Sequence, residues 1–201
     1  MGLLILGTGG HAKVALDIAL ESGIEVAGFL DDDQARHGQM IHGYKIHGPT
    51  NQWKQFGDAL FPAIGSNQSR KNVVQSVDPN APWQTLIHPK ATVSRFALVG
   101  SGVLVALGAC IGPDARIGDF AIINTSSSVD HDCEIGTYAH IAVGAHLAGN
   151  VHIGEGAFLG AGAIVIPGLE IGDWSLVGAG ATVIRPVQSN QTVIGTPAKP
   201  K

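Results

Sequence analysis

The hydrophobic residues of this chain follow a period of six over about half of its length. An aliphatic residue stands at every sixth position, and a small residue often stands two positions before it. This period is neither the 3.6 residues of an α-helix nor a hairpin spacing. It is typical of a solenoid in which each hexad forms one short side of a triangular coil. The aliphatic positions are Ile87, Val93, Val99, Val105, Ile111, Ile117, Ile123, Val129, Ile135, Ile141, Leu147, Ile153, Leu159, Val165, Ile171, Val177 and Val183.

Three hexads complete one coil, so residues 18 apart should stack in neighbouring coils, about 4.8 Å apart as adjacent strands are. The large aliphatic side chain fills the interior, and the small residue leaves room at the bend. A glycine often follows the aliphatic residue and tolerates the corner backbone. We therefore expect a parallel β-helix over residues 85–186, followed by a C-terminal tail at 187–201 that closes or flanks its end.

Residues 1–84 have a different pattern, in which short apolar runs alternate with stretches of helical periodicity. The expected strands are Leu3–Leu6, Glu25–Leu30 and Ala59–Ile64. A helical pattern follows the first strand, and another, Gln68–Val77, follows the third. This alternation predicts a small parallel α/β domain of Rossmann type. Pro79–Trp83 is the expected joint between the two domains.

The first expected strand ends in a glycine turn of the form Gly7-x-Gly9-x-x-Ala12. With acidic residues roughly 20 positions later, it matches the dinucleotide-binding fingerprint in form. The domain has only half the size of the two-part dinucleotide fold, so a mononucleotide fits better than NAD. The alternative is a turn that glycine merely shapes. His11 and the Asp31–Asp32 pair, at strand ends where α/β ligands bind, favour a binding site.

His131 is the residue that we expect to act as a general base. It is flanked by Asp130 and Asp132, and a carboxylate bonded to one imidazole nitrogen makes the other nitrogen more basic. Gly149, 18 residues later, should lie beside His131 in the next coil, where its N–H can face a developing oxyanion. The alternative is a solvated His–Asp surface pair.

Three further histidines, His140, His146 and His152, are spaced by six and invite a metal-site interpretation. A step of six moves from one side of the coil to the next, so their side chains cannot converge on one ion within a chain. We therefore expect no metal, although a site between subunits stays open. By the same geometry, one site can use both His131 and His140 only if neighbouring subunits supply them.

Several outward positions of the solenoid are apolar, which suggests contact with another copy of the chain. These positions are Phe96, Leu98, Leu104, Leu107 and Phe158. The net charge of −4 argues against nucleic acid as a partner. No apolar stretch approaches the roughly 20 residues that span a bilayer, so we expect no membrane insertion. The N-terminus lacks a signal-peptide layout, and Cys110 and Cys133 suit a reduced, cytoplasmic protein.

The order of the motifs resembles that of bacterial nucleotide-sugar acetyltransferases of the sialic acid O-acetyltransferase family. The similarity is greatest to members that N-acetylate UDP-4-amino-4,6-dideoxy sugars, and it implies a left-handed β-helix. The shared motifs are Gly9-Gly10-His11, Asp31-Asp32, Gly65-Ser66-Asn67, Asn124–Asp132, Tyr138–Ile141, Ala148–Val151 and Gly195–Lys199.

This resemblance implies a homotrimer that transfers acetyl from acetyl-CoA to the 4-amino group of a UDP-linked 4-amino-4,6-dideoxy sugar. It implies His131 as the base, Asp132 as its partner and Asn124 as a neighbour in the site. The residues implied to hold the nucleotide sugar are Gly9, Gly10, His11, Asp31, Asp32 and Gly65. Those implied to line an acetyl-CoA groove between subunits are His140, Gly149, Ala161 and Ala179.

Several alternatives stay open at this point. Asp132 stands where related N-acetyltransferases have Glu, so either Asp132 or Asp130 can orient His131. The nucleotide can be UDP or dTDP, and the acceptor can be an amine or a hydroxyl of sialic acid or a related sugar. A non-catalytic nucleotide-binding scaffold is a third hypothesis. The His131–Asp132 pair argues against it, because a scaffold has no need for such a pair.

Overall fold

The chain separates into two compact units, Met1–Pro89 and Lys90–Lys201. The computed structural model describes residues 2–78 and 80–201, so Pro79 of the expected joint lies outside the described residues. The boundary expected after residue 84 falls slightly before this division. None of the helices in the described part of the chain is long and apolar enough to cross a membrane.

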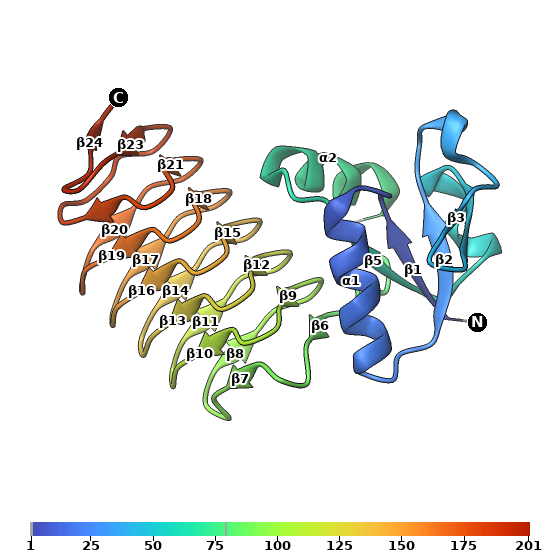
Figure 1. The fold of residues 1–201 in the computed structure, drawn as a ribbon, viewed down its shortest axis with the longest axis horizontal. Helices are drawn as coiled ribbons and strands as arrows, with labels where there is room; N and C mark the ends of the chain where they lie inside the picture. Colours follow the sequence, from blue (N-terminus) through green and yellow to red (C-terminus); the bar gives the residue numbers. More distant parts are fainter. Residues whose placement is uncertain (1, 79) are drawn as a thin grey trace. The chain divides into compact units, whose positions relative to one another are not determined.

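The first unit is a small α/β fold built on a mainly parallel sheet with strand order β3-β4-β2-β1-β5 (Figure 1). Strand β1 is fully buried and pairs in parallel with β2 on one side and β5 on the other. The elements are β1 (Leu3–Leu6), α1 (Gly10–Glu21), β2 (Val26–Leu30), η1 (Gln34–Arg36), β3 (Met40–Ile41), β4 (Tyr44–Gly48), η2 (Thr50–Gln55), β5 (Ala59–Pro62), α2 (Asn67–Val77) and β6 (Leu86–Ile87).

Helix α1 lies against the sheet through small and branched residues. Ala12, Ala15, Ile18 and Ala19 are all buried, and the alanines let the helix axis approach the strands closely. The expected strands and helices therefore form. The sequence pattern missed β4, where Ile46 is buried between more polar neighbours. It also missed the β3–β4 hairpin, whose turn has positive φ angles at His42 and Gly43.

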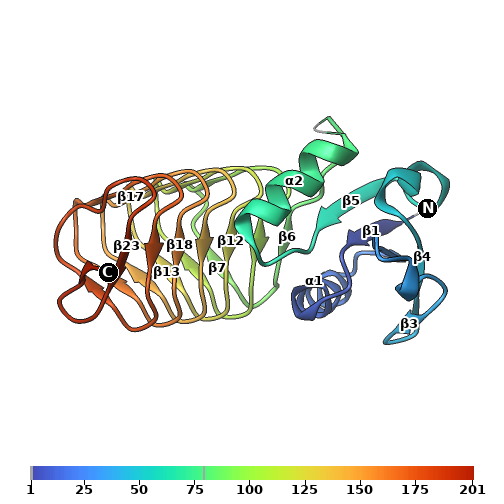
Figure 2. The ribbon, with the colours of Figure 1, turned by 90° about the horizontal axis from the view of Figure 1, so that it is seen from above.

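The second unit is a left-handed parallel β-helix in which successive strands occupy three sides in turn (Figures 1 and 2). The first side has the order β24-β23-β21-β18-β15-β12-β9, the second β22-β19-β16-β13-β10-β7 and the third β20-β17-β14-β11-β8. Residues 18 apart pair in register, as Ile123 with Ile141 and Ser128 with His146.

The strands of this unit are mostly two residues long. They are β7 (Thr92–Val93), β8 (Leu98–Val99), β9 (Leu104–Val105), β10 (Cys110–Ile111), β11 (Arg116–Ile117), β12 (Ile122–Ile123), β13 (Ser128–Val129), β14 (Glu134–Ile135), β15 (His140–Ile141), β16 (His146–Leu147), β17 (His152–Ile153), β18 (Phe158–Leu159), β19 (Ile164–Val165), β20 (Glu170–Ile171), β21 (Leu176–Val177), β22 (Thr182–Val183), β23 (Thr192–Ile194) and β24 (Lys199–Pro200).

The interior of the β-helix is filled by the two predicted tracks of large aliphatic and small residues. Val105 to Val183 of the aliphatic track and the apolar members of the small track between Ala109 and Ala181 contribute to one continuous core. The first aliphatic position departs from the pattern, because Ile87 is 37% exposed while Leu86 beside it is fully buried. The coil also continues past residue 186, since Val187 and Val193 join the core and β23 pairs in parallel with β21.

The apolar outward positions are only partly as expected. Phe96, Leu98 and Leu107 are 66%, 57% and 45% exposed. Leu104, however, is fully buried within the chain, as is Ile122 beside it in the next strand of the first side. The outward face of a strand is therefore not always the solvent face. Val143, at 48% exposure, is a further exposed apolar side chain in this unit.

Candidate functional site

A pocket of about 510 Å³ lies at the carboxyl edge of the sheet in the first unit. The chain leaves β1 and β5 by turns at this edge, and such a point in a parallel sheet is where α/β proteins bind ligands. All the residues expected to hold a nucleotide sugar line it. The lining residues are Gly7, Thr8, Gly9, Gly10, His11, Asp31, Asp32, Thr50, Ala63, Ile64, Gly65 and Val73.

At three positions of the pocket, packing within the fold does not require glycine, and the space beside the glycine is open. A Cβ added at Gly9, Gly10 or Gly65 would meet nothing within 4 Å. Gly7 differs, because its φ of 98° strains any other residue. Since α1 begins at Gly10, the free space at Gly9 and Gly10 adjoins backbone N–H groups suited to a phosphate.

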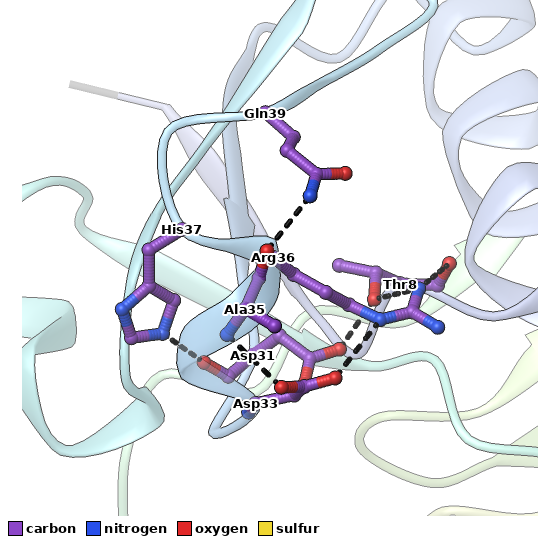
Figure 3. A network of polar contacts seen from close by, with 7 residues as sticks. All are labelled: Thr8, Asp31, Asp33, Ala35, Arg36, His37 and Gln39. Carbon is purple, nitrogen blue, oxygen red and sulfur yellow. Dashed lines mark hydrogen bonds and ion pairs between the residues drawn. The ribbon is translucent and has the colours of Figure 1, made fainter.

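The two acids at the end of β2 are held by hydroxyl groups. Thr8 Oγ1 donates to Asp31 Oδ2 at 2.5 Å, and the backbone and hydroxyl of Thr50 donate to Asp32 Oδ1 at 2.8 and 2.9 Å. Arg36 Nη1 donates to Thr8 Oγ1 at 2.8 Å, which links a guanidinium to the glycine turn (Figure 3). Thr8, Arg36 and Thr50 were not predicted from the sequence, because no spacing rule connects them to the acids.

His11 is held neutral beside the pocket. Burial, and then the positive charge of Arg70, lower its pKa from 6.5 to about 4. Arg70 is itself buried in α2, and its guanidinium donates to Ile64 O at 2.7 Å and to Asn67 Oδ1 at 3.0 Å. Arg70 thereby holds the turn that follows β5. This role of Arg70 was not predicted from the sequence.

In the second unit, His131 lies at the corner between the second and third sides, in the turn between β13 and β14. Its Nδ1–H donates to Asp132 Oδ2 at 2.8 Å, while Asp130 Oδ1 accepts from the His131 backbone N–H at 2.8 Å. Asp132, and not Asp130, therefore orients the imidazole. The Asp132 bond and then the Asp130 charge raise the pKa of His131 above its usual value.

Gly149 stacks on His131 as the 18-residue spacing predicts. A Cβ added at Gly149 would lie 2.5 Å from Nε2 and 3.1 Å from Nδ1 of His131. Because Nδ1 carries the proton donated to Asp132, Nε2 has the free lone pair of a base. A Cβ at position 149 would therefore collide with the His131 imidazole, so this position requires glycine.

His140 lies on the first side of the β-helix. Asn124, which the resemblance implied to be a neighbour of His131, contacts His140 within the chain. Asn124 Nδ2 is 3.0 Å from His140 Nε2. Asn124 precedes β13 and His131 follows it, so the two residues lie at different corners of the coil. Within one chain, Asn124 is a neighbour of His140 and not of His131. His140 is 7% exposed and meets Phe158 edge to face.

Ala161 and Ala179 follow β18 and β21, which places both at the corner between the first and second sides. They stack 18 residues apart and share this corner with Val143 and Asn124. The expected acetyl-CoA residues thus fall into two groups within one chain, with Gly149 beside His131 and the others on the first side or at its corner with the second. Among residues 2–78 and 80–201, no group of three or more His, Cys, Asp or Glu is arranged to hold a metal ion.

Comparison with known proteins identifies both units. Residues 2–77 match the PglD N-terminal domain family, and residues 150–185 match the bacterial transferase hexapeptide family. The GDP-perosamine N-acetyl transferase of Caulobacter crescentus, solved with CoA and GDP-perosamine, is 40% identical with a TM-score of 0.94. The alignment covers 100% of this chain and 97% of that one.

Two further relatives carry related names. The acetyltransferase domain of PglB from Neisseria gonorrhoeae, solved with acetyl coenzyme A, is 32% identical, with a TM-score of 0.92 and coverage of 99% of this chain and 98% of that one. The UDP-N-acetylbacillosamine N-acetyltransferase of Bacillus subtilis is 40% identical over 106 residues, 50% of this chain and 49% of the relative. The match spans half or less of the curated relatives' own lengths.

The structural similarity runs from end to end, and one family model matches within each unit. The chain therefore belongs to the family of hexapeptide-repeat sugar N-acetyltransferases that carry a PglD N-terminal domain.

Proposed function

We propose that this chain transfers acetyl from acetyl-CoA to the 4-amino group of a nucleotide-linked 4-amino-4,6-dideoxy sugar. The observation that carries the proposal is the His131 corner, where Asp132 binds Nδ1 at 2.8 Å and Gly149 leaves room beside Nε2. Nε2 takes a proton from the amine as the amine attacks the thioester carbonyl, and the thiolate of CoA leaves. The Gly149 N–H is the proposed donor to the oxyanion.

The nucleotide sugar is proposed to bind in the pocket of the first unit. The open space at Gly9, Gly10 and Gly65 accommodates a diphosphate near the start of α1. Asp31 and Asp32, at the end of β2, are suited to ribose hydroxyls or a base edge. The relatives' names include both GDP- and UDP-linked sugars, so GDP joins UDP and dTDP as a candidate nucleotide.

Acetyl-CoA is proposed to bind in a groove between subunits of a homotrimer. His140, Ala161 and Ala179 lie on the first side or its corner with the second, away from the His131 corner of the same chain. A neighbouring subunit that presents its His140 face to this His131 corner would complete the groove. We further propose a cytoplasmic location, because the free thiols of Cys110 and Cys133 suit a reducing compartment.

An incubation of the protein with acetyl-CoA and a panel of UDP-, GDP- and dTDP-linked amino sugars tests the activity directly. Mass spectrometry of the product should show one added acetyl group, on nitrogen. Sialic acid belongs in the panel, because O-acetylation of it would support the alternative acceptor. The absence of acetyl transfer to every acceptor in the panel would contradict the proposal.

His131→Ala tests the assignment of the base. We expect kcat to fall roughly 10²–10⁴-fold, because a general base acts mainly in the transition state. Acetyl-CoA affinity, measured by calorimetric titration, should change little. A variant that keeps near-normal turnover would exclude His131 as the base.

A further inference from the structure

The hydrogen bonds of Asn124 fix the orientation of its side-chain amide. The backbone N–H of Thr125 donates to Asn124 Oδ1 at 2.8 Å. A backbone N–H can only donate, so the opposite amide orientation would set two donors against each other. The group that Asn124 directs at His140 is therefore its NH₂, with Nδ2 3.0 Å from His140 Nε2.

This orientation decides which nitrogen of His140 carries the proton. An amide NH₂ can only donate, so Nε2 of His140 must accept with its lone pair. The neutral ring then carries its single proton on Nδ1. The ring cannot easily turn away, because His140 is 7% exposed and packs edge to face on Phe158 with ring centroids 5.1 Å apart.

The two histidines of the proposed active site thus both carry their proton on Nδ1, but the neighbouring side chain binds a different nitrogen in each ring. In His131, Asp132 accepts from Nδ1–H, which leaves Nε2 as a base. In His140, Asn124 donates to Nε2, which leaves Nδ1–H as the only proton that the ring can donate. A carboxylate beside one ring and an amide beside the other produce one proton acceptor and one hydrogen-bond donor.

We propose that Asn124 is a positioning residue that holds His140 as the neutral Nδ1–H tautomer, so that His140 donates a hydrogen bond to a carbonyl oxygen of acetyl-CoA. This inference rests on the proposed function, in which His140 lines the acetyl-CoA groove. It replaces the expected role of Asn124 beside His131 with one exerted through His140. The carbonyl oxygens of an acyl thioester and of the pantetheine amides are acceptors only, which matches a fixed donor.

The tautomer can be measured without any turnover. Long-range ¹H–¹⁵N correlation spectra of the ¹⁵N-histidine-labelled protein distinguish protonated from unprotonated ring nitrogens, and His140→Gln identifies the His140 signals. We expect a protonated Nδ1 and an unprotonated Nε2 at pH 8. The Nε2–H tautomer in the wild-type protein would overturn the proposal, whatever reaction the protein catalyses.

Asn124→Asp is the sharpest variant, because it is isosteric and keeps an oxygen for the Thr125 N–H. Its second oxygen faces His140 Nε2 and should draw the proton there. We expect the tautomer to reverse and acetyl-CoA affinity, measured by calorimetry, to fall about 10-fold, the equivalent of one hydrogen bond. Comparison of acetyl-CoA with CoA tells a thioester contact from a pantetheine contact.

Two further variants guard against misfolding and unspecific effects. Asn124→Ala removes the amide and should leave His140 with both tautomers and an intermediate affinity. Ser128→Ala is the matched control, since Ser128 Oγ lies 2.9 Å from Nδ1 of the exposed His146 and should affect only that ring. A reversed tautomer with unchanged affinity for both ligands would overturn the proposed contact, while leaving acetyl transfer from His131 intact.

Discussion

At the scale of single residues, the proposed chemistry depends on the absence of one side chain. Gly149 has no positive φ that demands glycine, yet a Cβ there would collide with the His131 ring. The requirement for glycine at this position comes from the neighbouring coil and not from its own backbone. The same close approach is the reason that we propose the Gly149 N–H as the donor to the oxyanion.

Gly149→Ala should therefore damage catalysis without unfolding the protein. The His131 side chain is 57% exposed, so its ring can swing outward to relieve the overlap, and the base leaves its position. We expect kcat to fall on the order of 100-fold, with a thermal midpoint close to that of the wild type. The double variant with His131→Ala should be no slower than His131→Ala alone, because both changes remove one base. Additive losses would contradict this account.

Asp132→Asn should move the acid limb of the pH–rate profile. His131 acts only when Nε2 is unprotonated, so a raised pKa means that activity is lost at a higher pH as the solution is acidified. Removal of the carboxylate lowers this pKa, and the limb of kcat/KM should shift to lower pH while the maximal rate falls at least ~10-fold.

Asp130→Asn is the matched control for this shift, because Asp130 raises the same pKa by its charge alone. The acid limb of the pH–rate profile of Asp130→Asn should shift to lower pH by less than that of Asp132→Asn, and the maximal rate should fall less. A limb that does not move in Asp132→Asn would refute the assignment of Asp132 as the orienting residue.

At the scale of elements, the β-helix and the α/β unit differ in how their buried polar groups are distributed. Each rung of the β-helix repeats the same pairing, so its core is a continuous stack of aliphatic and small side chains. The α/β unit instead concentrates polar and charged groups where β1, β2 and β5 end. There, burial and then the charge of a guanidinium from α2 lower the pKa of His11 in α1.

His11 should therefore make the first unit sensitive to acid. Its pKa is about 4 when folded and near 6.5 when unfolded, so the folded state binds fewer protons between these values and stability falls as pH falls below 6.5. We expect the free energy of unfolding of this unit to drop by roughly 2 kcal/mol between pH 7 and pH 5 from His11 alone. Urea titration followed by Trp53 and Trp83, in a Trp174→Phe background, measures it.

His11→Gln is the comparison that isolates this effect. The variant has no group that titrates in this range at position 11. Its free energy of unfolding should therefore fall by roughly 2 kcal/mol less between pH 7 and pH 5 than that of the wild type. Identical pH dependence in both proteins would show that His11 is not held neutral by burial and Arg70.

At the scale of the whole molecule, the separation of His131 from His140 in one chain is the reason that we expect assembly. We expect a homotrimer whose pockets each combine the His131 corner of one subunit with the His140 face of another. The exposed apolar residues Leu98, Leu107 and Val143 provide surface for such contacts. Light scattering should give a trimer, and a fully active monomer would contradict the arrangement.

Mixed assemblies test which chains supply each pocket. His131→Ala and His140→Ala proteins, each impaired alone, should regain part of the activity when unfolded and reassembled together, because some pockets then receive both intact histidines. Each variant taken separately through the same cycle is the control. No recovery in the mixture would indicate that both histidines act from one chain.

The sequence by itself determined the architecture and some of its contacts. In a solenoid, a fixed number of residues per coil converts distance along the chain into distance in space. The period of six therefore predicted the interior tracks, the different sides of His131 and His140, and the stacking of Gly149 on His131. Strand ends predicted the pocket residues Gly9, His11 and Asp31 in the same way, because parallel strands bring their carboxyl ends to one edge.

Only the tertiary structure decided which polar groups meet and which apolar groups are covered. Spacing places Asp130 and Asp132 equally close to His131, but the turn geometry aims only Asp132 at the ring. Asn124 bonds to His140, 16 residues away, and Arg70 reaches the turn after β5. These partners follow from side-chain direction and burial, which a periodic pattern does not encode, because hydrogen bonds form between atoms at fixed angles and not between positions in a repeat.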